Sequence, residues 1–173
     1  VATLARADQV AGDMHIRQIE EGVYLHTSYK KLPGIGYYPS NGLVVIVGSD
    51  AYIVDTPWRI EDTGKLLQWI EGGGYRTAAS ISTHFHEDRS SGIAYLNEIG
   101  VDTWASERTN QLLAEHGRAQ ARHSFHGREL SLLNGEIVAW YPGGGHTEDN
   151  IVVWLPGANV LAGGCLVRRV DTD

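Results

Sequence analysis

The chain has 173 residues, 42% hydrophobic and 20% charged, which fits one folded domain with a sizeable core and excludes a disordered or fibrous protein. Its 14 Lys and Arg against 21 Asp and Glu give a formal net charge of −7, so we expect no nucleic-acid partner, because such binders usually carry a net basic face. No stretch approaches the roughly 18 unbroken apolar residues of a membrane span, so we expect no membrane partner.

The N-terminal residues and the single cysteine bear on the compartment of the protein. Residues 1–13 read as a loose tail, and we expect residues 14–173 to form one domain. The N-terminus lacks the apolar centre of a signal peptide, which favours the processed form of an exported protein. One cysteine, Cys165, cannot form an internal disulfide, so in an exported protein it is a free thiol or has a function.

The first half of the chain changes from strand to helix periodicity. Residues 14–29 alternate around a Glu-Gly turn and predict a strand–turn–strand unit. Residues 32–42 hold two Pro and three Gly and predict a loop or hairpin tip. Two apolar runs, 43–47 and 51–56, predict a buried hairpin, and residues 59–74 predict a helix that ends at three glycines.

The second half alternates strands with helices and then ends in strands. We expect a strand at 77–83, a helix around 93–99, a strand at 101–106 and a helix at 107–117, followed from about residue 123 by strands and turns alone. This order predicts an α/β protein with mixed sheets covered by helices. The last strands have no helix to cover them and the chain stops soon after Cys165, so we expect a further segment that this chain lacks.

Two histidines and an aspartate follow the predicted strand 77–83. His84, His86 and Asp88 stand at i, i+2 and i+4, and alternate residues of extended backbone point the same way. Open α/β sheets bind ligands at such strand ends. Imidazole and carboxylate suit a borderline divalent metal, with zinc as first choice. The alternative is a polar loop whose histidines are merely solvated.

Two further signals lie in glycine-rich turns. His146 follows three glycines, whose bare backbone would let it approach another element, although a surface turn with an incidental histidine explains the same pattern. Cys165 follows Gly163 and Gly164 at the end of an apolar run. It is either a small buried hydrophobic residue, the common state of a free cysteine, or a thiolate that holds a metal.

Taken together, these motifs resemble a known family. HFHEDR (84–89), GGGHTEDN (143–150) and GGCLV (163–167) occur in this order, as in the class B metallo-β-lactamases of the di-zinc subclass with a cysteine ligand, and in particular the acquired carbapenemases of Gram-negative bacteria. The resemblance covers nearly all of residues 14–170. Further matches are AYIVDTPW (51–58), ISTHFH (81–86), YPSNGL (38–43) and the arginine three residues after Cys165.

The resemblance implies a fold and a set of metal ligands. The fold is an αβ/βα sandwich of two mixed sheets flanked by helices, with its C-terminal part missing from this chain. His84, His86 and His146 match the ligands of a first zinc, and Asp88 and Cys165 match two ligands of a second. The family's second site takes another histidine from beyond the end of this chain, so two zinc ions are expected only in the complete enzyme.

The implied activity is hydrolysis of the β-lactam amide bond of penicillins, cephalosporins and carbapenems, which confers antibiotic resistance. Zinc lowers the pKa of bound water toward about 7, so a metal-bound hydroxide attacks, and Asp88 has a catalytic role in orienting it. We expect a monomer with a small-molecule substrate in the periplasm. Alternatives are a thioester or lactone hydrolase of the same fold, or an inactive zinc-binding fragment; Arg89 and Cys165 favour the β-lactamase.

Substrate contacts are predicted at four positions. Arg168 would pair with the substrate carboxylate. Ile35 and Tyr37 would form a mobile apolar flap, and Trp58 would line the same wall. The plainer interpretations are an ordinary exposed arginine for Arg168 and a plain hairpin tip for Ile35 and Tyr37.

Three polar residues are predicted to support the metal ligands from behind, because ligand histidines usually donate their far N–H to a partner. Asp55 and Thr83 precede the metal loop, and Arg89 would lie near the thiolate. Asp55 and Thr83 could equally be turn residues. The remaining histidines are expected on the surface or in the core; they are His15, His26, His116, His123 and His126.

Overall fold

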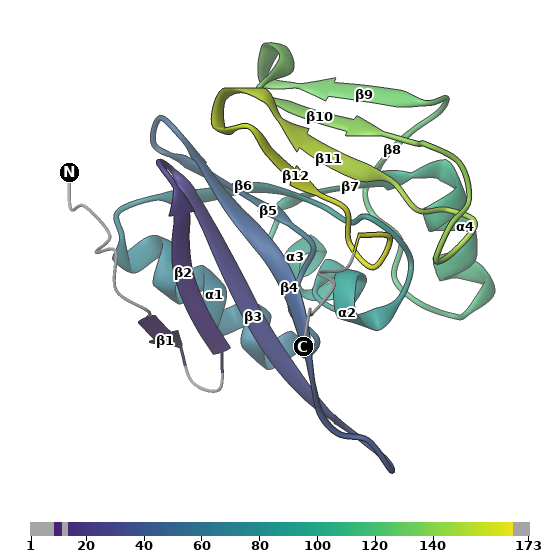
Figure 1. The fold of residues 1–173 in the computed structure, drawn as a ribbon, viewed down its shortest axis with the longest axis horizontal. Coiled ribbons are helices and arrows are strands. Elements are labelled where there is room, and N and C mark those ends of the chain that lie inside the picture. The colour runs from purple at the N-terminus through teal and green to yellow at the C-terminus, as the bar shows by residue number, and fades with distance from the viewer. Residues whose placement is uncertain (1–8, 12–13, 168–173) are drawn as a thin grey trace, which may run out of the picture.

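Two β-sheets pack face to face in the computed structural model, which describes residues 9–11 and 14–167 (Figure 1). The larger sheet has eight strands in chain order. Neighbouring strands pair antiparallel from the first to the fifth and parallel from the fifth to the eighth, so this sheet is mixed as predicted. The strands are β1 (Gln9–Ala11), β2 (Met14–Glu20), β3 (Val23–Leu32), β4 (Gly36–Val47), β5 (Asp50–Val54), β6 (Arg76–Ile81), β7 (Asp102–Ser106) and β8 (His123–Phe125).

The smaller sheet has four strands in the order β12-β11-β10-β9. Its described strands pair only antiparallel, so the expectation of two mixed sheets is wrong for this sheet within the described residues. Short turns at 133–136 and 156–159 join β9 to β10 and β11 to β12, and such turns can join only antiparallel neighbours. The elements are β9 (Glu129–Leu132), the 3-10 turn η1 (Leu133–Gly135), β10 (Ile137–Trp140), β11 (Val152–Leu155), the 3-10 turn η2 (Pro156–Ala158) and β12 (Val160–Ala162).

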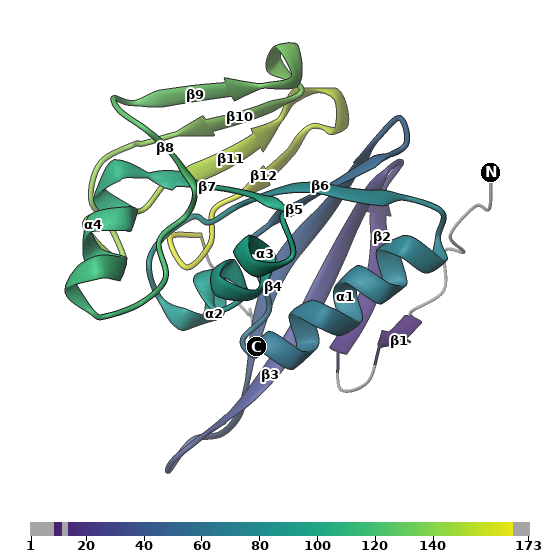
Figure 2. The same cartoon turned by 180° about the vertical axis from the view of Figure 1, so that it is seen from behind.

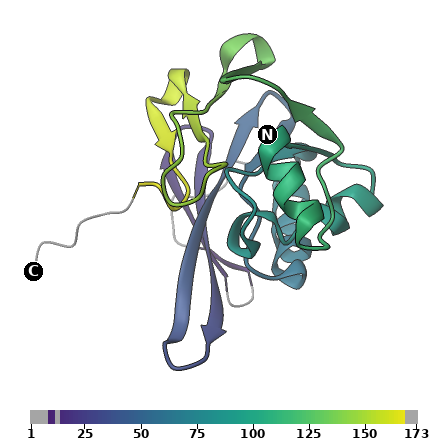
Figure 3. The same ribbon diagram turned by 90° about the vertical axis from the view of Figure 1, so that its right-hand side faces the viewer.

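The helices lie on the face of the larger sheet that points away from the smaller sheet (Figure 2). The side view shows the same layers, with the teal helices and the yellow strands on opposite sides (Figure 3). No helix in the described ranges has the length and apolar character needed to cross a bilayer. The helices are α1 (Ile60–Gly72), α2 (Glu87–Ser90), α3 (Ile93–Glu98) and α4 (Glu107–Glu115).

Successive residues of a strand point to opposite faces of the sheet, so the larger sheet contributes side chains to a core on each face. On β5, Ala51 and Ile53 face α1, while Val54 faces the smaller sheet. Leu66 and Ile70 of α1, one helical turn apart, are fully buried against the first of these cores. The strands of this sheet are therefore buried on both faces where helix and second sheet cover them.

Most predicted elements are confirmed, but residues 32–42 are not a loop. The ladder between β3 and β4 continues to the pair Leu32 and Gly36, which leaves only residues 33–35 as the turn. This half of β4 has a strand neighbour on one side only, and such an edge tolerates Pro39, whose nitrogen has no hydrogen to donate. The Pro and Gly content therefore led to the wrong prediction of a loop where the chain forms a long hairpin arm.

The two ends of the described chain also differ from expectation. Gln9–Ala11 pair with β2, although residues 1–13 are predicted to be a tail. Backbone pairing at a sheet edge needs no apolar pattern, so the sequence carried no signal for it. Residues 1–8 and 12–13 lie outside the described residues. At the other end, β12 stops at Ala162, and the predicted strand gives way to a turn at Gly163 and Gly164.

The close packing of Gly42 generates a stability prediction. A Cβ on Gly42 would lie 2.3 Å from Nε2 of His26 and 2.5 Å from the carbonyl oxygen of Asp55, whereas a Cβ on Gly72 in α1 would meet nothing within 4 Å. We expect Gly42→Ala to lower the free energy of unfolding by about 1–3 kcal/mol through overpacking. Gly72→Ala, the control, should change it by less than about 1 kcal/mol. Urea denaturation measures both, and equal stabilities of the two variants would contradict the packing argument.

Candidate metal centre

The segment that follows β6 carries three predicted ligands. His84 and His86 lie in the irregular stretch between β6 and α2, and Asp88 lies in the first turn of α2. The expectation that extended backbone aligns them is therefore wrong. The chain turns into a helix at Glu87, and the turn, not strand alternation, brings Asp88 back toward His84.

Three imidazoles meet around one point. The ring centroids of His84 and His86 are 4.9 Å apart, and the planes of these rings meet at 76°. The ring of His146 lies 5.1 Å from each of the other two, at 76° to His84 and at 83° to His86. Nδ1 of His86 lies 3.2 Å from Nε2 of His146. Near-perpendicular rings at these distances can direct their nitrogen lone pairs to a common centre.

All five predicted ligands belong to one cluster. His84, His146 and Cys165 form one group and His84, His86 and Asp88 another; within each group, the potential ligand atoms lie within 4.8 Å of one another. His84 belongs to both groups. The cluster therefore centres on His84, and it mixes the three-histidine and Asp–Cys sets that the resemblance implies.

The surroundings of His84 fit a metal ion. This side chain is fully buried, and its Nε2 has no hydrogen-bond partner among the described residues. Burial is the main reason that the pKa of His84 is lowered, so the ring is neutral and keeps a free lone pair. A buried, unpartnered nitrogen costs free energy unless it is satisfied, and a divalent cation would satisfy it.

A glycine turn places Cys165 beside this cluster. Gly164 has a φ of +53°, and a Cβ there would lie 2.4 Å from Oγ1 of Thr83, so glycine lets the turn pack against the metal loop. Sγ of Cys165 lies 3.4 Å from Oδ2 of Asp88 and 3.4 Å from Nη2 of Arg89. Burial raises the pKa of the thiol, and Arg89 partly offsets this.

Arg89 is a buried cation between acidic groups. Its Nε lies 3.0 Å from Oδ2 of Asp88, its Nη1 lies 3.4 Å from Oδ2 of Asp55, and it donates a hydrogen bond to the carbonyl of Asn41. Burial works against its charge, but Asp55 and Asp88 outweigh burial and raise the pKa of Arg89. The predicted location near the thiolate matches this geometry.

Asp55 and Thr83 lie directly behind His84. Asp55 accepts hydrogen bonds from the backbone N–H of Thr83 at 2.7 Å and from its hydroxyl at 2.9 Å. Oγ1 of Thr83 is 3.4 Å from Nδ1 of His84. Burial raises the pKa of Asp55 to about 6, although Arg89 and the Thr83 hydrogen bonds lower it. Asp55 has a φ of 64°, a conformation that its side-chain contacts must hold in place.

Comparison with known proteins assigns the family. The family model of the metallo-beta-lactamase superfamily matches residues 35–173. The chain belongs to this superfamily. A metallo-beta-lactamase type 2 of Pseudomonas aeruginosa is 43% identical over 166 residues, which span 96% of this chain and 68% of the relative.

Solved structures of the superfamily share the fold of this chain. TMB-1 has a TM-score of 0.90 and 48% identity, over 93% of this chain and 74% of its own. DIM-1, in a crystal exposed to ceftazidime, has a TM-score of 0.90 and 46% identity, over 95% and 75% of the two chains. The predicted fold class is thereby confirmed, and the chain spans 68–75% of the length of these relatives.

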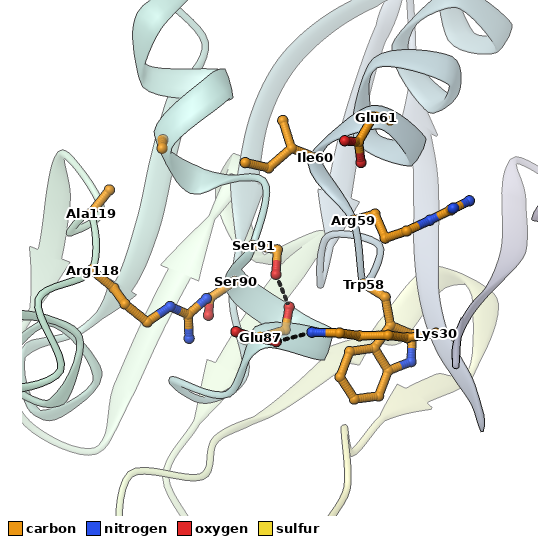
Figure 4. Close-up of a pocket in the computed structure, with 11 residues that line it drawn as sticks. Lys30, Trp58, Arg59, Ile60, Glu61, Glu87, Ser90, Ser91, Arg118 and Ala119 are labelled. Atoms are coloured by element: carbon orange, nitrogen blue, oxygen red, sulfur yellow. Dashed lines mark hydrogen bonds and ion pairs between the residues drawn. The ribbon is translucent and has the colours of Figure 1, made fainter. Parts of the chain in front are cut away.

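The predicted substrate residues do not gather at one place. Ile35 and Tyr37 lie at the exposed end of the β3–β4 hairpin, 68% and 74% exposed, and Arg168 lies outside the described residues. Trp58 lines a cavity of about 520 Å³ with Glu87 and Arg118. Figure 4 shows Lys30 extending along the Trp58 ring toward Glu87, with which it forms an ion pair.

A second cavity, of about 610 Å³, is lined by Asp88, Arg89, Cys165 and the 38–43 part of β4. Because Glu87 lines the first cavity and Asp88 the second, the first turn of α2 stands between them. The second cavity therefore adjoins the cluster directly, whereas none of the five ligands lines the first.

Sequence reasoning missed several residues that hold the ligands. Ser40 on β4 donates to Oδ2 of Asp88 at 3.3 Å and to its carbonyl oxygen at 3.1 Å. Asp149 accepts a hydrogen bond from the backbone of Phe85, between the two metal-loop histidines. Neither serine nor aspartate in a polar stretch signals such a contact, because the partners come from elements far apart in the chain.

His26 is fully buried behind Asp55. Its Nε2 lies 3.0 Å from the carbonyl oxygen of Asp55, to which the neutral ring donates. Burial lowers the pKa of His26 to about 4; the bond to Asp55 opposes this effect and Arg89 adds to it. The unfolded chain therefore binds a proton at a higher pH than the folded chain does at this site.

This shift generates a pH prediction. The stability that neutral His26 supplies is fully present above pH 6.5 and is lost as the pH falls toward 4. Replacement by Gln keeps a donor to Asp55 but removes the titration. The free energy of unfolding should therefore fall less steeply in His26→Gln than in the wild type between pH 6.5 and 4.5, by about 1 kcal/mol per pH unit. Asp55 titrates in both proteins, so its effect cancels in the comparison. Urea denaturation gives the free energy of unfolding at each pH, and equal slopes for the two proteins would contradict the lowered pKa of His26.

Proposed function

We propose that this chain hydrolyses the amide bond of β-lactam rings with zinc held by His84, His86, His146, Asp88 and Cys165. Membership of the metallo-β-lactamase superfamily supports β-lactam hydrolysis in general and implies metal ions. The observation that carries the proposal for this chain is the fully buried Nε2 of His84, which has no partner within residues 9–11 and 14–167 and lies in a group of nitrogen, oxygen and sulfur donors.

The donor set suits zinc. Imidazole, carboxylate and thiolate are the ligands that zinc takes in proteins, and a cation among them would favour the thiolate of Cys165, whose pKa burial otherwise raises. When bound, zinc supplies a Lewis acid and lowers the pKa of water to near 7. We keep the expectation of two ions for the complete enzyme, with the three histidines at the first and Asp88 and Cys165 at the second.

Asp88 is the catalytic carboxylate in this proposal. The contacts recorded for its side chain among the described residues go to Oδ2, from Ser40, Arg89 and Cys165. They fix the plane of the carboxylate, so that one oxygen could bind the metal while the other accepts a hydrogen bond from the attacking water. Asp88 thereby orients the water toward the amide carbonyl and holds its proton.

Substrate binding would use the surfaces on either side of α2. Trp58 offers an aromatic wall in one cavity, and the exposed Ile35 and Tyr37 offer apolar contact from the hairpin. Pairing of Arg168 with the substrate carboxylate stays a prediction, as do carbapenem hydrolysis, the monomeric state and the periplasmic location.

A chromogenic cephalosporin tests the function. We expect hydrolysis that a metal chelator abolishes and that added zinc restores, with a zinc content of one to two ions per chain by elemental analysis. A glutathione thioester and a lactone, assayed in parallel, should turn over far more slowly. Turnover of those substrates alone would move the proposal to another hydrolase of the fold, and cephalosporin turnover that survives chelation would end the zinc mechanism.

Two histidines provide a matched test of the cluster. His86→Ala removes one of the three facing imidazoles, while His126→Ala removes an exposed ring that pairs with Glu107 at the surface. We expect the first variant to lower kcat/KM for the cephalosporin at least about 100-fold. Loss of a residue that supports a metal ligand lowers activity about 10–100-fold, and loss of the ligand itself should cost more. The second should stay within about twofold, in the range of a typical surface substitution. Steady-state rates at saturating zinc measure both, and equal losses would argue against a site at His86.

The hairpin end provides a test of substrate contact. Ile35→Ser with Tyr37→Ser removes exposed apolar area and should leave stability unchanged. We expect KM to rise about fivefold with kcat within twofold, as for a lost contact worth about 1 kcal/mol in both ground and transition states. Ile99→Ser, an exposed isoleucine at the end of α3, is the control. An unchanged KM in the double variant would remove the hairpin from the binding surface.

A further inference from the structure

A buried carboxylate lies behind the metal loop, and the proposed reaction does not use it. Asp149 follows His146 by three residues, between β10 and β11, and its side chain is fully buried. Oδ2 of Asp149 accepts two hydrogen bonds, from the backbone N–H of Phe85 at 2.9 Å and from the hydroxyl of Thr109 at 2.8 Å. Burying a polar carboxyl group is costly unless it is hydrogen-bonded, so its place here calls for a reason.

The position of Phe85 supplies that reason. Phe85 stands between His84 and His86, so the direction of its amide sets the backbone from which both imidazoles project. Its carbonyl oxygen is held as well, by the hydroxyl of Ser90 at 2.8 Å and by the guanidinium of Arg118. The backbone N–H and the carbonyl oxygen of Phe85 are therefore both hydrogen-bonded to side chains, in a segment that belongs to no strand or helix.

The donors to Asp149 are themselves ordered. Ser106 caps α4: its Oγ accepts the backbone N–H of Thr109 at 3.1 Å and lies 2.8 Å from Oγ1 of Thr109. Since the Thr109 hydroxyl gives its proton to Asp149, it receives the proton of Ser106. The chain of hydroxyls therefore points one way, toward Oδ2 of Asp149, and it anchors Asp149 to the start of a helix.

The residues next to Asp149 hold the opposite side of the cluster. Oδ1 of Asn150 accepts the backbone N–H of Thr147 at 2.5 Å and its hydroxyl at 2.9 Å, which closes the turn that carries His146. The N–H of Ile151 donates to the carbonyl of Thr83 at 2.9 Å. One short segment, 149–151, thus touches the loop of His84 and His86 and closes the loop of His146.

We propose that Asp149 is a positioning residue for the metal centre: by holding the Phe85 amide, it sets the directions of His84 and His86 relative to His146. This inference rests on the metal cluster of the proposed function. Loss of the acceptor would leave the Phe85 N–H buried and unpaired, so the loop would shift to find another partner. The ligands would remain in the sequence, but their spacing would relax, and metal affinity would fall as it does when a supporting residue of a metal ligand is lost.

The test compares acceptor-deleting variants with acceptor-keeping variants in the full chain. Asp149→Ala deletes the acceptor, while Asp149→Asn keeps an oxygen for Phe85 and Thr109. Thr109→Val and Thr109→Ser form a milder pair that removes or keeps the hydroxyl on Asp149. Glu148→Gln, next in sequence but exposed and paired with Arg108, is the control. The readouts are the zinc dissociation constant by competition with a chromophoric chelator and the ligand-field bands of the cobalt(II)-substituted protein.

We expect Asp149→Ala to weaken zinc binding about 10–100-fold and to alter the cobalt bands, with Asp149→Asn within about threefold of the wild type. Thr109→Val should weaken it several-fold and Thr109→Ser should not. If Asp149→Ala fails to fold, the Thr109 pair decides the outcome. Wild-type affinity and bands in the deleting variants, or equal losses in Asp149→Asn and Asp149→Ala, would overturn the positioning role while leaving the proposed function intact. A wild-type chain that binds no zinc would overturn both.

Discussion

The buried guanidinium of Arg89 is the interaction on which the rest of the site depends. It joins α2, where it also pairs with the neighbouring Asp88, to three segments that are distant in the chain, through Asn41 on β4, Asp55 after β5 and Cys165 after β12. Removing one partner of a buried ion pair leaves an uncompensated charge, which typically costs about 3–5 kcal/mol. The same cation also limits the repulsion between Asp55 and Asp88. The charge of Arg89 also opposes the effect of burial, which raises the pKa of Asp55.

The topology of the larger sheet brings these segments to a common edge. β5 and β6 are parallel neighbours, so Asp55 and the loop of His84 both follow the carboxyl ends of their strands. The smaller sheet packs against the other face and supplies His146 and Cys165 from the turns around β11 and β12. The cluster therefore lies at one end of the interface between the two sheets, where each sheet contributes ligands that the other lacks. Support comes from the side chains of Asp55, Asp149 and Ser40, all of which are buried.

Sequence reasoning identified the five clustered side chains but not all the reasons for their proximity. The spacing of His84, His86 and Asp88 suggested a strand, and the structure has an irregular segment and a helical turn instead. The Pro and Gly content of residues 32–42 suggested a loop where a long hairpin arm exists, because edge strands tolerate residues that central strands do not. Asp149 gave no signal at all, since an aspartate in a polar turn is usually solvated. Its burial depends on α4, which closes over it through Thr109 and Ser106.

The sequence by itself determined the local features of this protein: the periodicities of its strands and helices, the glycine turns that expose His146 and Cys165, and a set of donor side chains suited to zinc. Local sequence can do this because periodicity, turn chemistry and ligand type are properties of neighbouring residues. Only the tertiary structure decided which donors share a centre, that the buried His84 has a nitrogen with no partner in the described part of the chain, and that Arg89 is the cation beside Asp88 and Cys165. These properties arise from contacts between segments up to 77 residues apart, such as Asp88 and Cys165, and desolvation acts on a group only after all the elements around it have packed.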